Sequence, residues 1–281
     1  MFMDDLWVEA WNRITNTPRQ GDGDSSPFVA SGARGAVLCL HGLTGTPFEI
    51  RPLAEALARE GFAVEAPVLA GHARTPQDLL QTTWPDWLAT AEAAFQRLSA
   101  DNKGRPVGVM GFSTGGLLAL RLARQRQNLG ALAVLSTPLR MKPLQVRGIR
   151  WLNKLPRRLV HRRFGYVPKH GGPDVQDASM KPRNPGLPVM PLPALNSLLD
   201  LMQVVRLDLP SITVPTLVAH GQKDQTIPLE DSLEIAGSLG CETIERLWLP
   251  RSGHLLGIDL EKHLLAGALN KFFLRHLGAM E

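Results

Sequence analysis

The stretch 107–116 reads VGVMGFSTGG and contains the pentapeptide Gly111-Phe112-Ser113-Thr114-Gly115. An apolar run comes before the pentapeptide and a helix-forming run, 117–126, follows it, which predicts a strand, a sharp turn and a helix. In such a turn the serine is exposed on strained backbone, and glycines flank it because side chains there would collide with the neighbouring strand and helix. The stretch therefore predicts that Ser113 is a nucleophile.

Strand-like and helix-like runs alternate on both sides of this stretch. The runs that predict strands are 36–40, 62–67, 107–110, 131–135, 216–219 and 243–249. The runs with helical spacing are 48–60, 85–98, 117–126 and 260–277, and a further one at 2–14 predicts a short N-terminal helix. This order predicts an α/β fold in which helices flank a mostly parallel central sheet.

The segment 138–208 interrupts the alternation and has its own composition. Between Arg140 and Arg183 it carries twelve Lys and Arg against two acidic residues, a local net charge of +10. The whole chain carries +5, so the remainder is −5. Six prolines between Pro173 and Pro193 argue against a regular strand–helix unit. We therefore expect a core formed by 1–137 and 209–281, with 138–208 inserted as a basic, proline-containing cap.

A serine hydroxyl needs a base to accept its proton, and the base needs an acid to orient it. Where a serine nucleophile lies in such a strand–turn–helix, called a nucleophile elbow, the expected order along the chain is Ser, then Asp or Glu, then His. Asp224 follows the strand predicted at 216–219, and His254 follows the last predicted strand. We predict Asp224 as the orienting acid and His254 as the base.

The alternative acids are Asp208, Glu230 and Asp231. The other histidines do not occupy the loop after the final strand, and His41 and His220 are expected to be structural.

The negatively charged oxygen of a tetrahedral intermediate needs hydrogen-bond donors. One predicted donor is the backbone N–H of Thr114, at the start of the helix after Ser113. The other comes from the loop after the first predicted strand, His41-Gly42-Leu43-Thr44-Gly45, where the N–H of Leu43 is the best candidate.

Taken together, these motifs resemble those of a known family. The matching residues are AVLCLHGLTGTP at 36–47, Gly71-His72, GFSTGG at 111–116, the Asp224 turn and Ser252-Gly253-His254. Over 27–137 and 209–281 the chain is similar to bacterial carboxylesterases and monoacylglycerol lipases of the α/β-hydrolase superfamily. The resemblance implies an α/β-hydrolase fold and a Ser/Asp/His triad. It also implies an acyl-enzyme mechanism without metal or cofactor, and carboxylic esters as substrates.

We expect a serine hydrolase that cleaves medium-chain or monoacylglycerol-like esters through an acyl-enzyme on Ser113. The same three residues would also serve a thioesterase, an amide hydrolase, a carbon–carbon bond hydrolase or an acyltransferase, because a fold does not fix a substrate. A ligand-binding receptor on a hydrolase fold is the alternative without enzymatic activity. Serine in the elbow disfavours chemistry that uses an aspartate nucleophile.

Charge and composition limit the partners. The sequence pI is about 9.6, yet the positive charge is concentrated in 138–208 and no nucleic-acid-binding module is recognisable, so no nucleic acid partner is expected. The basic cap suggests an anionic lipid surface as a possible partner, with simple solvation of the charges as the alternative. The N-terminus resembles no signal peptide, and the two cysteines are too few for a disulfide framework, so a cytoplasmic location is expected.

Overall fold

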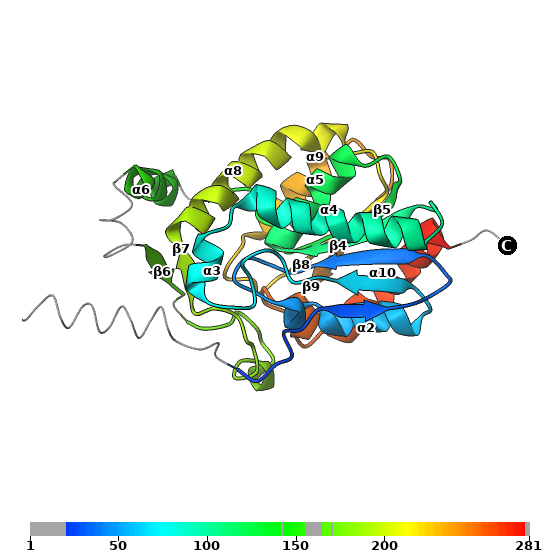
Figure 1. Cartoon of the computed structure of the whole chain (residues 1–281), viewed down its shortest axis with the longest axis horizontal. Helices are drawn as coiled ribbons and strands as arrows, with labels where there is room; N and C mark the ends of the chain where they lie inside the picture. Colours follow the sequence, from blue (N-terminus) through cyan, green and yellow to red (C-terminus); the bar gives the residue numbers. More distant parts are fainter. Residues whose placement is uncertain (1–20, 142, 155–164, 170, 279–281) are drawn as a thin grey trace, which may run out of the picture.

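A computed structural model of the chain describes residues 21–141, 143–154, 165–169 and 171–278, and the helix predicted at 2–14 lies outside these ranges. Its centre is a seven-stranded sheet with the order β1-β3-β2-β4-β5-β8-β9 (Figure 1). The strands are β1 Phe28–Ala30, β2 Ala36–Leu40, β3 Ala63–Ala66, β4 Val107–Phe112, β5 Leu129–Leu135, β8 Thr216–Gly221 and β9 Ile244–Leu249. Strands β6 (Tyr166–Pro168) and β7 (Val189–Pro191) form a separate antiparallel pair.

Every neighbouring pair in the main sheet is parallel except β1 with β3. Strands β2 and β4 are buried along their whole length, as expected of strands that helices cover on both faces. Each of the six predicted strands corresponds to a strand of this sheet, and the mostly parallel sheet is confirmed. The short edge strand β1 was not predicted.

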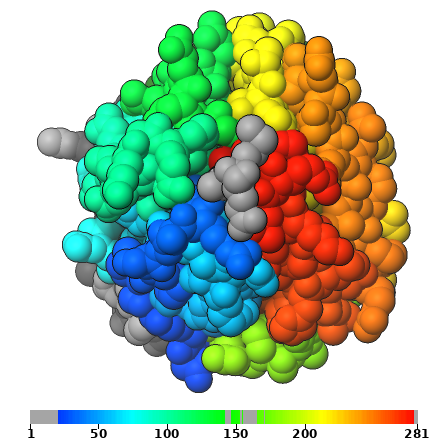
Figure 2. All heavy atoms as spheres, turned by 90° about the vertical axis from the view of Figure 1, so that its right-hand side faces the viewer, coloured from blue at the N-terminus to red at the C-terminus, as the bar shows by residue number. Residues whose placement is uncertain are grey.

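Helices cover both faces of the sheet. In Figure 1, α4, α5 and α8 lie above the sheet, and α2 and α10 lie below it. Figure 2 shows the end of the molecule where α10 (red) runs between the α2 segment (blue) and the β8–β9 segment (orange). The helices are α2 Arg51–Arg59, α3 Pro76–Leu80, α4 Trp84–Asp101, α5 Thr114–Gln125, α6 Pro143–Asn153, α8 Leu192–Asp208, α9 Leu229–Ser238 and α10 Lys262–Leu277. None of the helices in the described ranges is long and apolar enough to cross a membrane.

The segment 138–208 contains more regular structure than its prolines suggested. Helix α6 and the β6–β7 pair lie at one end of the molecule in Figure 1. Helix α8 has 17 residues, begins after Pro191 and carries Pro193 in its first turn, where proline is tolerated. Its buried Leu195, Leu199 and Met202 belong to the same apolar cluster as α4 and α5. The division of the chain into a core and a cap stays a prediction.

Helix α5 packs unusually close to the sheet because its first turn contains glycine. A Cβ at Gly115 would collide with the backbone carbonyl of Leu40 and lie 2.7 Å from the carbonyl oxygen of His41. A Cβ at Gly111 would collide with the carbonyl of Gly115, and one at Gly116 with the Thr137 hydroxyl. These glycines let the helix start directly against the ends of β2 and β4.

We predict that Gly115→Ala lowers the free energy of unfolding by about 1–3 kcal/mol, because the added methyl group meets backbone that has no room to move. The matched control is Gly267→Ala in helix α10, where a Cβ meets nothing within 4 Å. This control should raise stability by about 0.5–1 kcal/mol through the helix propensity of alanine. Urea unfolding of the three proteins measures both effects, and equal destabilisation by the two substitutions would contradict the steric explanation.

Candidate active site

Ser113 lies in the turn between β4 and α5, at the carboxyl end of a central strand. Its backbone has φ 53° and ψ −119°, a left-handed conformation that costs free energy in any residue other than glycine. The turn is held by two backbone hydrogen bonds. Ser113 N donates to Leu135 O at 2.8 Å, and Gly116 N donates to Ser113 O at 2.9 Å. The strained turn therefore presents the Ser113 side chain above the carboxyl edge of the sheet.

His254 follows β9, and its ring reaches the same point from the other side. Its Nε2 lies 3.2 Å from Ser113 Oγ. The imidazole is buried and packs on Phe112, with the ring centroids 4.9 Å apart. The loop after β9 thus brings an imidazole into hydrogen-bond contact with a residue 141 positions away in the sequence.

Asp224 follows β8, and its fully buried carboxylate lies behind the imidazole. Its Oδ2 lies 2.8 Å from His254 Nδ1. Its Oδ1 accepts hydrogen bonds from Thr226 N and Ile227 N, both at 2.8 Å. Burial alone would raise the pKa of this carboxyl, but the His254 imidazole and the Ile227 amide lower it more. The pKa of Asp224 therefore lies below its ordinary value, and the group is ionised at neutral pH.

The partners of His254 determine which of its nitrogens carries the proton. An ionised carboxylate only accepts hydrogen bonds. Nδ1 must therefore carry the proton, and its N–H donates a hydrogen bond to Asp224. The lone pair of Nε2 then faces the Ser113 hydroxyl, which donates to it. This arrangement can move the hydroxyl proton to His254 while Asp224 stabilises the resulting positive charge.

The alternative acids have other partners. Asp208 forms an ion pair with Arg121 at 2.7 Å, and Glu230 lies in the first turn of α9. Asp231 is fully buried and accepts a hydrogen bond from Leu139 N at 2.7 Å, at the start of the segment 138–208. His220, expected to be structural, is hydrogen-bonded at Nδ1 to Ser232 Oγ at 2.8 Å.

The loop after β2 lies directly against Ser113. A Cβ at Gly42 would lie 3.2 Å from the Cβ of Ser113, so glycine permits this approach. His41 fixes the orientation of the Gly42 carbonyl. Its Nε2 accepts a hydrogen bond from Leu69 N at 3.1 Å, so its Nδ1 carries the proton and donates to Gly42 O at 2.9 Å. Burial lowers the pKa of His41 to about 3, so the ring is neutral.

The orientation of the Gly42 carbonyl also fixes the N–H of Leu43. The two groups share one planar trans peptide, in which C=O and N–H point in opposite directions. Gly45 N donates to the same carbonyl at 3.1 Å and holds it from a second side. The other predicted donor, Thr114 N, is the first amide of α5 and has no acceptor within the helix.

The family of the chain follows from comparison with known proteins. A family model described as serine aminopeptidase, S33, matches residues 31–261. The chain belongs to this family. The S33-family protein is 29% identical over 254 residues to the thermostable monoacylglycerol lipase of Bacillus sp. (strain H-257), a match that covers 90% of this chain and 96% of that protein. It is 26% identical over 240 residues to the carboxylesterase of Bacillus subtilis (strain 168), with 85% and 92% covered.

A solved structure with a similar fold supports the family assignment. The structure belongs to work on LipS and LipT, two metagenome-derived lipolytic enzymes. It matches this S33-family protein with a TM-score of 0.81 and 28% identity, over 90% of this chain and 98% of that one. The predicted α/β-hydrolase fold and the predicted resemblance to bacterial carboxylesterases and monoacylglycerol lipases are confirmed.

Glu49 is a buried ionisable group that our sequence analysis did not identify. It ends a short 3-10 helix, Pro47–Glu49, and is only 5% exposed. Its carboxyl lies where a Cβ of Gly45 would be, and its Oε2 has no hydrogen-bond partner within the described residues. Burial raises the pKa of Glu49 to about 7, although the charges of Lys169 and His254 act in the opposite direction. The sequence signal was an acidic residue directly between two large apolar residues, Phe48 and Ile50.

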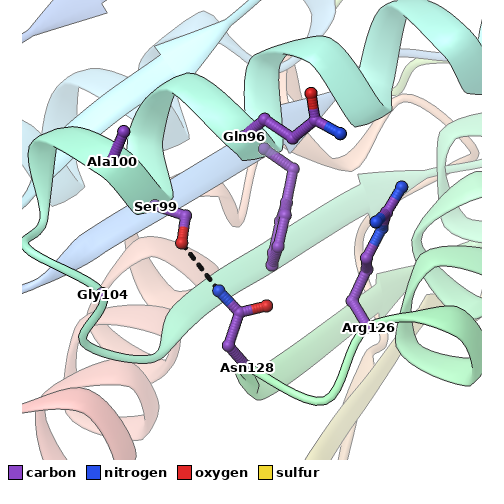
Figure 3. A pocket seen from close by; sticks show the side chains of 7 residues that line it. Gln96, Ser99, Ala100, Gly104, Arg126 and Asn128 are labelled. Atoms are coloured by element: carbon purple, nitrogen blue, oxygen red, sulfur yellow. Dashed lines mark hydrogen bonds between the residues drawn. The ribbon is translucent and has the colours of Figure 1, made fainter.

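A surface hollow of about 400 Å³ lies far from these residues. Figure 3 shows Gln96, Ser99, Arg126 and Asn128 around it, with Asn128 Nδ2 donating to Ser99 Oγ at 2.7 Å. Asn128 directly precedes β5, so the hollow is at the amino edge of the parallel sheet, whereas Ser113 is at the carboxyl edge. It therefore plays no part in the arrangement around Ser113.

We predict that Glu49 makes the S33-family protein less stable as the pH rises. The folded protein holds a proton on this carboxyl up to about pH 7, whereas the unfolded chain releases it near pH 4.5. Stability is therefore lost as the pH rises through this interval. Glu49→Gln removes the dependence, so its stability relative to the wild type should increase by about 3 kcal/mol between pH 4.5 and pH 8.

Urea unfolding at a series of pH values measures this difference. The matched control is Glu60→Gln, since Glu60 is an exposed residue at the end of α2. A difference between Glu49→Gln and wild type that stays constant across the pH range would contradict the prediction.

Proposed function

We propose that this protein hydrolyses carboxylic esters, with Ser113 as nucleophile, His254 as base and then acid, and Asp224 as the group that orients the imidazole. The observation that carries the proposal is the hydrogen-bonded chain from Ser113 Oγ to His254 Nε2 at 3.2 Å and from His254 Nδ1 to Asp224 Oδ2 at 2.8 Å. The likeness to a monoacylglycerol lipase and to a carboxylesterase supports esters as the substrate class.

Acylation begins when Ser113 Oγ attacks the ester carbonyl carbon and its proton moves to His254 Nε2. The carbonyl oxygen becomes an oxyanion, which the N–H groups of Leu43 and Thr114 stabilise. The intermediate collapses as the bond to the alcohol oxygen breaks, and His254 gives its proton to that oxygen. Asp224 remains ionised throughout and stabilises the imidazolium.

Deacylation repeats these steps with water as the nucleophile. His254 takes a proton from water, and the hydroxide attacks the acyl carbon on Ser113. The second oxyanion uses the same two amides, and His254 returns the proton to Ser113 Oγ as the acid leaves. We propose medium-chain or monoacylglycerol-like esters as substrates, because one relative is a monoacylglycerol lipase.

We predict that Ser113→Ala lowers kcat by about 10⁴-fold or more on p-nitrophenyl esters, because no other group in the site replaces the nucleophile. The assay uses an ester series from acetate to laurate, and the chain length with the highest kcat/KM identifies the preferred acyl group. Ser99→Ala is the control, since Ser99 lies at the opposite edge of the sheet. A Ser113→Ala variant that kept the wild-type rate would overturn the mechanism.

Amide hydrolysis is the second candidate, because the description of the family is a serine aminopeptidase. The same nucleophile and base would serve an amide, with His254 giving its proton to the leaving amine. The comparison substrate is an aminoacyl p-nitroanilide measured beside the esters. A kcat/KM for the anilide above that of every ester would replace esters by amides as the substrate class.

We also propose that the basic insertion binds an anionic lipid surface. On helix α6, Trp151 is 62% exposed and lies one helical turn after the exposed Arg147, and the exposed Lys154 directly follows the helix. Tryptophan flanked by basic residues is favoured at a membrane interface. The cytoplasmic leaflet carries negative charge, which agrees with the cytoplasmic location that we propose.

We predict that the protein binds phosphatidylglycerol vesicles more strongly than phosphatidylcholine vesicles, and that salt weakens the binding because it screens the charges. Trp151→Ala should weaken vesicle binding, whereas Leu233→Ala should not, although Leu233 is also exposed, at 48%, on helix α9. Vesicle sedimentation measures the bound fraction. Binding that is insensitive to both salt and lipid charge would show that the basic charges are only solvated.

A further inference from the structure

The segment 173–177 of the insertion lies between the loop that carries Asp224 and the loop that carries His254. We propose that Asp174 is a positioning residue that holds these two loops in register, so that the acid, the imidazole and Ser113 stay in one hydrogen-bonded chain. This inference rests on the proposed function. It assigns to the insertion a role in the catalytic step itself, in addition to any role in covering the substrate.

Asp174 contacts the Asp224 loop through its side chain. One carboxylate oxygen, Oδ2, accepts hydrogen bonds from Gln225 N at 2.8 Å and from Thr226 Oγ1 at 2.9 Å. Thr226 also donates its backbone N–H to Asp224 Oδ1 at 2.8 Å. Thr226 therefore connects Asp174 to Asp224, with its hydroxyl on one carboxylate and its amide on the other.

Asp174 contacts the His254 loop through its backbone and the rest of its carboxylate. Its carbonyl oxygen accepts a hydrogen bond from Leu255 N at 3.0 Å, and Leu255 directly follows His254. Its Oδ1 lies so close to Gly253 that a Cβ there would be 2.6 Å away. The residues on both sides of His254 are thus in contact with Asp174.

A second aspartate, Asp259, holds the residues that follow Asp174. Asp259 is fully buried and accepts hydrogen bonds from Gln176 N at 3.0 Å and Asp177 N at 2.9 Å. The same carboxylate accepts a hydrogen bond from Gly253 N at 2.7 Å. Hydrogen bonds to an ionised carboxylate are stronger than those between neutral groups, so Asp259 holds the segment firmly against the His254 loop.

The geometry at Ser113 explains why such anchoring matters for the reaction. Proton transfer needs His254 Nε2 within hydrogen-bond distance of Ser113 Oγ, and these atoms are 3.2 Å apart. A displacement of about 1 Å at a reacting group can lower a rate by about 100-fold. Loss of Asp174 would leave Gln225 N and Thr226 Oγ1 without their acceptor, and the Asp224 loop would shift. None of these contacts involves the substrate, so KM should change little.

The test compares Asp174→Ala, Asp174→Asn and Asp177→Asn in the full chain. Asp174→Ala should lower kcat by about 10- to 100-fold with KM within about twofold of wild type. It should slow labelling of Ser113 by a fluorophosphonate to a similar extent. Asp174→Asn should recover most of the activity, since the amide oxygen can accept both hydrogen bonds. Asp177→Asn is the matched control, because its carboxylate bonds to Ser179 and Lys262 and touches neither loop.

Thr226→Val supplies an independent test that does not depend on the folding of Asp174→Ala. It removes only the hydroxyl that donates to Asp174 and should lower kcat several-fold. The double variant Asp174→Ala with Thr226→Val should be no slower than Asp174→Ala alone. Asp174→Ala already removes the hydrogen bond that Thr226→Val would remove. Wild-type kcat in Asp174→Ala would overturn the positioning role, and if Asp174→Ala does not fold, wild-type kcat in Thr226→Val would overturn it.

The two proposals fail in distinguishable ways. Activity that survives in Ser113→Ala would overturn the proposed function. An inactive Ser113→Ala together with a fully active Asp174→Ala would leave the proposed function intact and overturn only the role of Asp174. A rise in KM with unchanged kcat in Asp174→Ala would also overturn it, since that result assigns the residue to substrate binding.

Discussion

The left-handed backbone at Ser113 is the constraint on which the rest of the site depends. It turns the chain from strand β4 into helix α5 within one residue, and this is possible only because the adjacent glycines leave room for the helix against the ends of the strands. The hydrogen bonds around the turn and the packing of α5 keep the unfavourable conformation in place. The backbone position of Ser113 is consequently set by the turn itself and does not depend on His254 or Asp224.

The parallel sheet brings the partners to Ser113. Strands β2, β8 and β9 run in the same direction as β4, so the loops that follow them all leave at one edge. These loops carry Gly42, Asp224 and His254. Backbone amides donate hydrogen bonds to three buried carboxylates at this edge, those of Asp224, Asp231 and Asp259. At Glu49, burial outweighs the nearby charges of Lys169 and His254 and raises the pKa of the carboxyl to about 7.

The sequence predicted the features that depend on local pattern and on chain order. The six strands, the turn at Ser113 and the loops with Asp224 and His254 follow from apolar runs and from the fixed topology of parallel strands. Asp174, Asp259 and Glu49 did not emerge, because their contacts join segments far apart in the chain. Asp174 and Thr226 are 52 residues apart, and Gln176 and Asp259 are 83 apart. Helix α8 was missed although its apolar residues have helical spacing, since the prolines before it suggested irregular structure.

The hydrogen bond at the Asp231 carboxylate limits where this chain can be joined to that of another family member in a chimaera. It holds Leu139 at the start of the segment 138–208. Asp174 and Asp259 hold residues 174–177, and Thr44 O accepts a hydrogen bond from Leu187 N at 2.9 Å. The segment 138–208 is thus attached to the rest of the chain at several separate points. A chimaera with another family member should exchange only the chain between Leu139 and Asp174. A boundary placed after Asp174 would separate the loops of Asp224 and His254 from an aspartate that is hydrogen-bonded to both of them.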